Sequence, residues 1–279
     1  FGIDASINEN HRLLQISIDR NEPIDAFNLV WYAPMVTDME PLPVNRIFRG
    51  INAGYLRKAW DSKSLSLAFK GGYNLADHAH LDMGTFVLDY NDIRWVSDLG
   101  RDDYDLPDYF DKTVGGGRWQ YFRLNTKSHN TLLLNDEDQQ ADAKARIVDY
   151  DTSTDEPFAT VDLSEAYTPY ANSVIRTYKL NGNNKVTITD KIERKEGLQS
   201  IQWQMLTETD VEVSGNRAIL SLGGKQMEVN ILQPESAAFE LASAEQAKPE
   251  LLNEGYKLFK FRITEISESA NDIVVQFEY

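Results

Sequence analysis

The sequence contains no cysteine and no long apolar run, and only four of its 279 residues are histidine. Without cysteine the chain cannot form disulfides, thiolate zinc sites or cysteine nucleophiles, so any metal must be held by imidazole and carboxylate groups. No run of about 18 apolar residues is present that could cross a membrane as a helix. The sequence opens at Phe1 without a methionine or a leader, so we expect a fragment or a processed product.

Basic residues are scarce relative to acidic ones. The chain has 28 Lys and Arg against 44 Asp and Glu, which gives a net charge of −16. Nucleic acids and anionic membranes require broad basic surfaces, so neither is expected as a partner. A local basic cluster could still bind an anionic sugar, and the segment 118–123 (RWQYFR) is one such cluster. Its candidate substrate contacts are Arg118, Trp119, Tyr121 and Arg123. A strand with outward-facing arginines explains the same pattern.

Two regions of the chain differ in pattern. Within residues 1–43, the apolar spacing of Pro23–Tyr32 predicts a short helix. From Asn45 onward the chain consists of short β-type runs separated by turn residues. The clearest early runs cover residues 54–60, 65–70, 85–90 and 92–98.

The second half of the chain continues the β-type pattern. Residues 181–184 (NGNN) predict a tight turn between strands at 174–180 and 185–192, because Asn and Gly tolerate positive φ. Similar turn signals occur at 214–216 and 223–224. We therefore predict an all-β fold, a large antiparallel β-sandwich over residues 44–279, preceded by a short N-terminal helical remnant in residues 1–43.

Three of the four histidines, at positions 78, 80 and 129, lie in polar segments bordered by strand patterns. In residues 77–83 (DHAHLDM), strand alternation would place His78, His80 and Asp82 on one face. Residues two apart on a strand are roughly 7 Å apart. Both imidazoles could then address one ion, or one could bind a metal while the other meets substrate. A hydrogen-bonded histidine pair on a solvated strand is the alternative.

Further ligands come from two other segments. Asp98 follows a strand pattern in which Trp95 indicates partial burial, and a buried carboxylate needs a partner that a cation can supply. His129 precedes the run 130–134, which could form a third strand beside the first two. Two imidazoles and a carboxylate suit zinc and leave one coordination position open. A turn-capping role before Leu99 explains Asp98 equally well when it is considered alone.

Together these motifs resemble the C-terminal domain of heparinase II/III-like polysaccharide lyases, which include related alginate and oligosaccharide lyases. Over about residues 45–195, three features match in order: His78-x-His80-x-Asp82 with Gly84 and Phe86 following, Trp95-x-x-Asp98-Leu99-Gly100, and His129-Asn130-Thr131. The resemblance implies a β-sandwich preceded by an upstream helical toroid domain. It also implies β-elimination of an acidic polysaccharide or oligosaccharide, and a periplasmic or secreted location.

The resemblance also implies roles for individual residues. His80, Asp98 and His129 are expected to bind zinc, and His78 is expected to be the catalytic histidine that faces substrate. Tyr104, in the loop after Asp98, is a second catalytic candidate, although an ordinary aromatic on the sandwich rim explains it too. Arg101 could meet a substrate carboxylate or pair with a neighbouring aspartate. The family's tyrosine base belongs to the toroid, so we expect the isolated chain to be weakly active or inactive.

Two other functional classes remain open at the level of sequence. A non-catalytic carbohydrate-binding sandwich could stack Trp119, Tyr121 and Phe122 on sugars. A cupin-like metalloenzyme also uses His-x-His, but the cupin motif has a glutamate a few residues later. This chain has Asp82 and then Asp89 there.

Overall fold

The structure is a computed structural model that describes residues 42–268 and 271–279. The chain divides into two compact units, Phe1–Pro43 and Val44–Tyr279. The architecture below is that of the second unit. The helix and the helical remnant expected within residues 1–43 lie outside the described residues.

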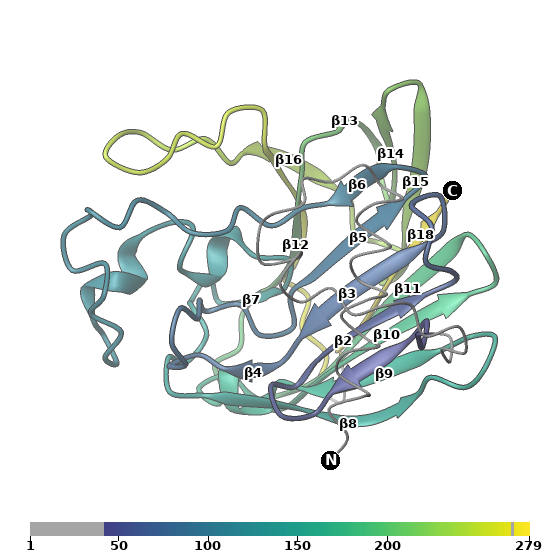
Figure 1. Cartoon of the computed structure of the whole chain (residues 1–279). Coiled ribbons are helices and arrows are strands. Elements are labelled where there is room, and N and C mark those ends of the chain that lie inside the picture. The colour runs from purple at the N-terminus through teal and green to yellow at the C-terminus, as the bar shows by residue number, and fades with distance from the viewer. Residues whose placement is uncertain (1–41, 269–270) are drawn as a thin grey trace, which may run out of the picture. The chain divides into compact units, whose positions relative to one another are not determined.

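The described part of the second unit is built from three antiparallel sheets, which confirms the predicted all-β sandwich (Figure 1). The five-stranded sheet has the order β1-β2-β3-β5-β6, with β1 Arg46–Phe48, β2 Ala53–Arg57, β3 Ser66–Lys70, β5 Phe86–Tyr90 and β6 Ile93–Val96. The four-stranded sheet has the order β16-β17-β12-β7, with β7 Leu132–Leu134, β12 Ile201–Thr207, β16 Glu240–Ser243 and β17 Lys257–Ile263.

The third sheet has nine strands in the order β13-β14-β15-β18-β11-β10-β9-β8-β4. Their bounds are β4 Gly72–Tyr73, β8 Lys144–Asp151, β9 Phe158–Asp162, β10 Ala171–Asn181, β11 Lys185–Arg194, β13 Asp210–Ser214, β14 Arg217–Leu222, β15 Lys225–Gln233 and β18 Asn271–Glu278. The hairpin predicted at 181–184 is confirmed, since Asn181 pairs with Lys185 and Gly182 has a φ of 61°. The turn signals at 214–216 and 223–224 join β13 to β14 and β14 to β15.

Aromatic side chains from all three sheets meet in the core. Phe86 of β5 lies 6.3 Å from Trp203 of β12 and 6.0 Å from Phe277 of β18, measured between ring centroids. All three side chains are at most 1% exposed. Burial of such large rings stabilises the fold, and replacing one by alanine typically costs about 3–5 kcal/mol.

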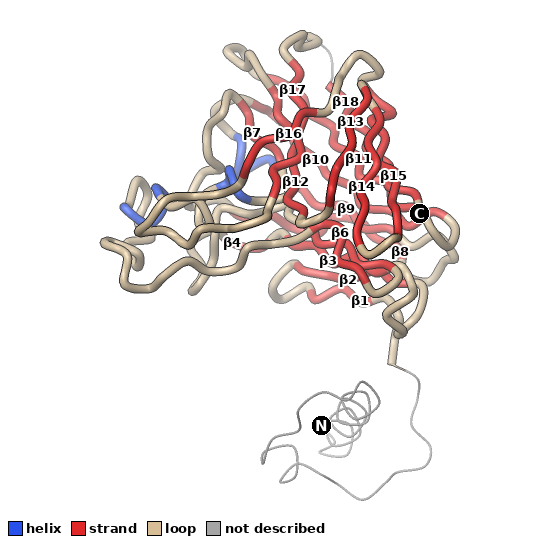
Figure 2. The backbone as a smooth tube through the Cα atoms, turned by 90° about the horizontal axis from the view of Figure 1, so that it is seen from above, coloured by secondary structure: helices blue, strands red, loops and turns tan. Residues whose placement is uncertain are grey.

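Loops and short 3₁₀ helices gather at one side of the strands (Figure 2). They include the long segment between β6 and β7, which contains η1 Gly117–Gln120 and η2 Thr126–Ser128. A further 3₁₀ helix, η3 Ser164–Tyr167, follows β9. Within the described ranges, no helix has the length and apolar character needed to span a bilayer.

Candidate functional site

The segment that carries His78, His80 and Asp82 is a loop between β4 and β5, so the predicted strand is wrong. His78 has a φ of 59°, in the left-handed region, which breaks the alternation that a strand would impose. His78 is exposed and His80 is partly exposed, whereas Asp82 is buried. The loop ends at Gly84, whose φ is +82° and where a Cβ would lie 2.6 Å from Leu163 Cδ1. Only glycine fits that turn.

Two buried polar side chains hold this loop in place. Arg118 donates from Nη2 to the Ala79 carbonyl at 2.9 Å and from Nη1 to the Tyr109 carbonyl at 2.7 Å. Gln139 accepts the Met83 N–H and donates to the Met83 carbonyl. Because Ala79 separates the two histidines, the Arg118 contact fixes the backbone from which both imidazoles project.

His129 meets Asp98 at the junction of two sheets. His129 follows η2 and Asp98 follows β6, and Ser97 and β7 both pair with β12. The distance between His129 Nδ1 and Asp98 Oδ2 is 3.2 Å. The other Asp98 oxygen accepts the Gly100 N–H at 2.7 Å. Asp98 therefore caps the turn and pairs with the histidine at the same time.

The protonation equilibria of these groups are linked. Burial opposes ionisation of Asp98, but the hydrogen bond and charge of His129 outweigh it, so the pKa of Asp98 lies well below its usual range. Burial likewise opposes protonation of His129, but the bond and charge of Asp98 raise its pKa. Burial, with the nearby His129, lowers the pKa of His80 to about 4. His80 is thus neutral at pH 7, the form in which imidazole binds metals.

Asn130 anchors the backbone beside His129. Its amide donates to the carbonyls of Phe86 and Ser97 and accepts the Leu206 N–H, so it connects β5, the residue that follows β6, and β12. Arg176 of β10 donates to the Asn130 carbonyl and to the carbonyl of Gly84 while pairing with Asp190. Both members of that ion pair are fully buried.

The residues present fit a divalent metal ion. One ligand atom each of His80, Asp82 and His129 lies within 4.8 Å of the others. His129 Nε2 is buried and has no hydrogen-bond partner among the described residues. Buried polar atoms normally have a partner, and a bound metal ion would provide one. Imidazole and carboxylate donors suit zinc.

Two ligand sets can be compared with this geometry, and the group whose ligand atoms lie within 4.8 Å of one another contains Asp82 and not Asp98. In the predicted set, Asp98 binds the metal together with His80 and His129. In the other, Asp82 completes the set and Asp98 orients His129 through Nδ1, as carboxylates often do beside metal-binding histidines. Asp82 accepts a hydrogen bond from Lys70 Nζ at 2.7 Å through Oδ1, and its second oxygen makes no hydrogen bond with any described residue.

The remaining predicted site residues are not all at the surface. Arg101 and Tyr104 are exposed, and the guanidinium of Arg101 lies 4.8 Å from the Tyr104 ring centroid. Trp119 and Tyr121 are only 8% and 7% exposed, so their rings are not presented for stacking on a sugar. Arg123 donates to Asn253 and to loop carbonyls. Direct contact with substrate stays a prediction for Arg118, Trp119 and Tyr121. Their burial does not favour it.

Sequence reasoning missed the residues that support the site. Gln139 and Arg176 act from segments far along the chain, and no local pattern marks them. Asn130 belongs to the motif His129-Asn130-Thr131, but nothing in the sequence indicated its role. The polar alternation of Gln202 and Gln204 within an apolar strand was a usable signal, because it places two amides on one face of β12.

Comparisons with known proteins agree with this architecture. A family model described as "Heparinase II/III-like, C-terminal" matches residues 43–278. No curated protein matched the chain. Among solved structures, the heparan sulfate lyase HepC from Pedobacter heparinus superposes with a TM-score of 0.71 at 16% identity, over 98% of this chain and 42% of its own. A crystal structure of heparinase III superposes with a TM-score of 0.69 at 13% sequence identity. The match covers 86% of this chain and 37% of the heparinase III chain.

These solved structures share the fold, and this chain spans less than half of their length. The family match rests on nearly the whole second unit, including the loops that carry the histidines. The chain therefore belongs to the heparinase II/III-like family, of which residues 43–278 form the C-terminal domain.

Proposed function

We propose that the chain is the sandwich portion of a polysaccharide lyase that cleaves an acidic, uronic-acid-containing polysaccharide by β-elimination. The full-length protein would contain an upstream helical toroid, with the polysaccharide between the two parts, and would act in the periplasm or outside the cell. The family match and the solved heparan sulfate lyase and heparinase III of the same fold support this assignment.

β-Elimination requires three tasks of the protein. The carboxylate on C5 must be neutralised, the C5 proton removed, and the departing C4 oxygen protonated as the C4–O bond breaks to leave a C4–C5 double bond. His78 is the candidate for one of the proton transfers, since it is exposed and histidine is the side chain used most often as a general acid or base. Tyr104 and Arg101, also exposed, are candidates for contact with the sugar.

The observation that carries the proposal is the convergence of His80, Asp82, Asp98 and His129 beside the loop of His78. A divalent ion such as zinc would be held there and would supply positive charge that fixes the surrounding loops. Arg118 donates to the carbonyl of Ala79, the residue after His78, and Asn130, the residue after His129, donates to the carbonyls of Phe86 and Ser97, so tertiary hydrogen bonds hold the backbone beside both histidines.

Zinc titration of single variants tests the ligand set. If Asp98 is a ligand, Asp98→Ala abolishes stoichiometric zinc and Asp82→Ala does not. If Asp82 is the ligand, the reverse holds, and Asp98→Ala only weakens binding, by about 10–100-fold, as expected for a partner of a liganding histidine. Retention of zinc in both variants and in His129→Ala would contradict a metal centre at this place.

A further inference from the structure

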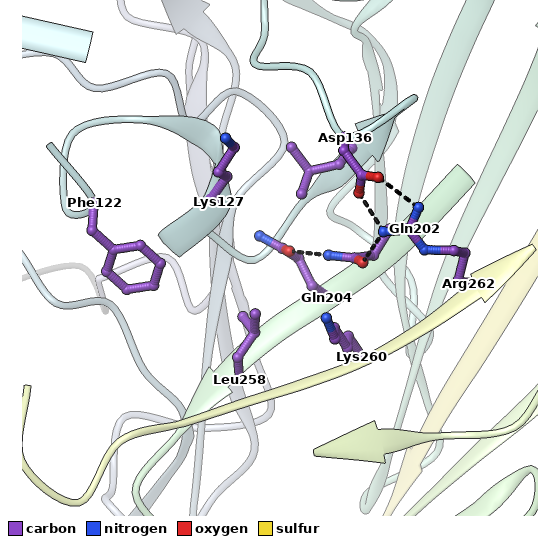
Figure 3. Close-up of a pocket in the computed structure, with 9 residues that line it drawn as sticks. Phe122, Lys127, Asp136, Gln202, Gln204, Leu258, Lys260 and Arg262 are labelled. Carbon is purple, nitrogen blue, oxygen red and sulfur yellow. Dashed lines mark hydrogen bonds and ion pairs between the residues drawn. The ribbon is translucent and has the colours of Figure 1, made fainter. Parts of the chain in front are cut away.

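A pocket lies on the face of β12 that points away from the core. Trp203 packs into the core, whereas Gln202 and Gln204 line a pocket of about 200 Å³ that β17 and the segment before η2 also enclose. Figure 3 shows Phe122 at one end of this pocket and the pair of Arg262 and Asp136 at the other.

The lining carries an excess of positive charge. Three cations, Lys127, Lys260 and Arg262, face a single carboxylate, Asp136. Arg262 already engages Asp136, from Nη1 to Oδ2 at 2.7 Å. The ammonium groups of Lys127 and Lys260 make no ion pair or hydrogen bond within residues 42–268 and 271–279. In a chain of net charge −16, this pocket is a local reversal of sign.

Nearby acids do not cancel this charge through direct contacts. Glu240 lies opposite Lys260 in the β16–β17 register, but no ion pair joins them in the described structure. Asp138 accepts the Thr126 N–H. Burial raises the pKa of the Asp138 carboxyl, and the nearby charge of Lys127 opposes that rise without cancelling it. The hydrogen bond from Arg262, followed by the charges of Arg262, Lys260 and Lys127, lowers the pKa of Asp136.

The rest of the lining suits a pyranose ring. Phe122 and Leu258 offer apolar surface, and the buried amides of Gln202 and Gln204 form the floor. Gln202 Nε2 donates to Gln204 Oε1 at 2.8 Å, and Gln202 Oε1 accepts from Arg262. An apolar wall with a few fixed polar groups is the usual make-up of a small-ligand site.

The pocket is also joined to the candidate metal centre. Gln204 Nε2 donates to the backbone carbonyl of His129 at 2.9 Å and to that of Thr126 at 3.0 Å. A ligand in the pocket would therefore sit against the side chain that supports the backbone of a proposed metal ligand.

We propose that this pocket binds one anionic sugar unit, with Lys127 and Lys260 contacting its carboxylate or sulfate and Phe122 and Leu258 contacting its ring. The proposal rests on the proposed function, in that it identifies the pocket as a further subsite for the same acidic polysaccharide. Two source chemistries, a uronate carboxylate and a sulfate ester, share the required negative charge.

The test measures binding of glucuronate, glucose 6-sulfate and neutral glucose to the complete 279-residue chain by NMR titration. The variants are Lys127→Ala, Lys260→Ala and both together, with Lys63→Ala as the control because Lys63 is an exposed lysine in the loop before β3. Each pocket lysine should contribute about tenfold in affinity through a charge-assisted hydrogen bond. The double variant should lose measurable binding of the anionic probes, and Lys63→Ala should match the parent. Whichever anionic probe binds more tightly identifies the preferred source chemistry.

Unchanged binding in the double variant would overturn the proposal, as would parent binding of glucose as tight as that of glucuronate. The two proposals fail separately. If the full-length protein is no lyase while the lysine variants still lose the anionic probes, the pocket stands and the proposed function falls. If lyase turnover is observed while the double variant binds the probes normally, only the pocket falls.

Discussion

Replacement of Arg118 tests whether the His78–His80 loop is held by a tertiary contact. In Arg118→Ala, the carbonyls of Ala79 and Tyr109 lose their donors. Leaving a buried acceptor unsatisfied costs about 1–3 kcal/mol, and the bond to Tyr109 is buried whereas that to Ala79 is partly buried, so we expect a loss of about 2–4 kcal/mol in the free energy of unfolding. In Arg118→Lys the ammonium group can reach only one of the two carbonyls, because lysine lacks the planar guanidinium group. This variant should therefore lose about half as much free energy of unfolding as Arg118→Ala.

The assay is urea denaturation followed by tryptophan fluorescence, with Arg217→Ala as the matched control. Arg217 forms an exposed ion pair with Glu228, so Arg217→Ala should lower the free energy of unfolding by less than about 1 kcal/mol. Zinc affinity provides a readout that simple destabilisation does not move, since Ala79 directly precedes His80. An Arg118→Ala protein that unfolds at the parent urea concentration and binds zinc with parent affinity would refute the positioning role.

Two further predictions concern the metal and the buried ion pair. Alanine at His80 or His129 should abolish stoichiometric zinc by elemental analysis, and with it the stabilisation of about 2.7 kcal/mol expected at a zinc concentration 100 times the Kd. His78→Ala should keep zinc, and a metal-free His78→Ala would mean that both histidines chelate the ion. Arg176→Ala should cost about 3–5 kcal/mol in urea denaturation because it leaves Asp190 charged and buried. Arg176→Met combined with Asp190→Leu should recover much of that loss, and no recovery would show that the bonds to Gly84 and Asn130 matter more than the charge.

Local patterns predicted the sandwich well because its strands and turns are determined locally. Strand alternation and the Asn-Gly turn at 181–184 need only neighbouring residues, and the hairpin of β10 and β11 follows from them. The loop of His78 and His80 was misjudged because a spacing of two is the same in a strand and in a loop. The geometry there is decided by Arg118 and Gln139, which come from other segments of the chain.

Sequence motifs named the histidines and Asp98 as candidates, but spacing could not give their arrangement, and Asp82, which the structure groups with His80 and His129, was not named as a ligand. The pairing of Asp98 with His129 depends on Ser97 and β7 both pairing with β12, a long-range register that spacing cannot reveal. Likewise, an aromatic cluster such as Trp119 and Tyr121 has the same sequence whether it packs inside or stacks on a sugar. Burial, which only the fold determines, separates the two interpretations.

The most direct test of the central claim is a turnover measurement on the full-length parent protein. Incubation with acidic polysaccharides should generate an unsaturated uronate, detected by its ultraviolet absorbance. His78→Ala should keep the fold and the metal but lose about 10²–10⁴ in rate, the usual contribution of a proton-transfer group. The isolated 279-residue chain should be weakly active or inactive. Hydrolysis without an unsaturated product, or full turnover in His78→Ala, would contradict the account.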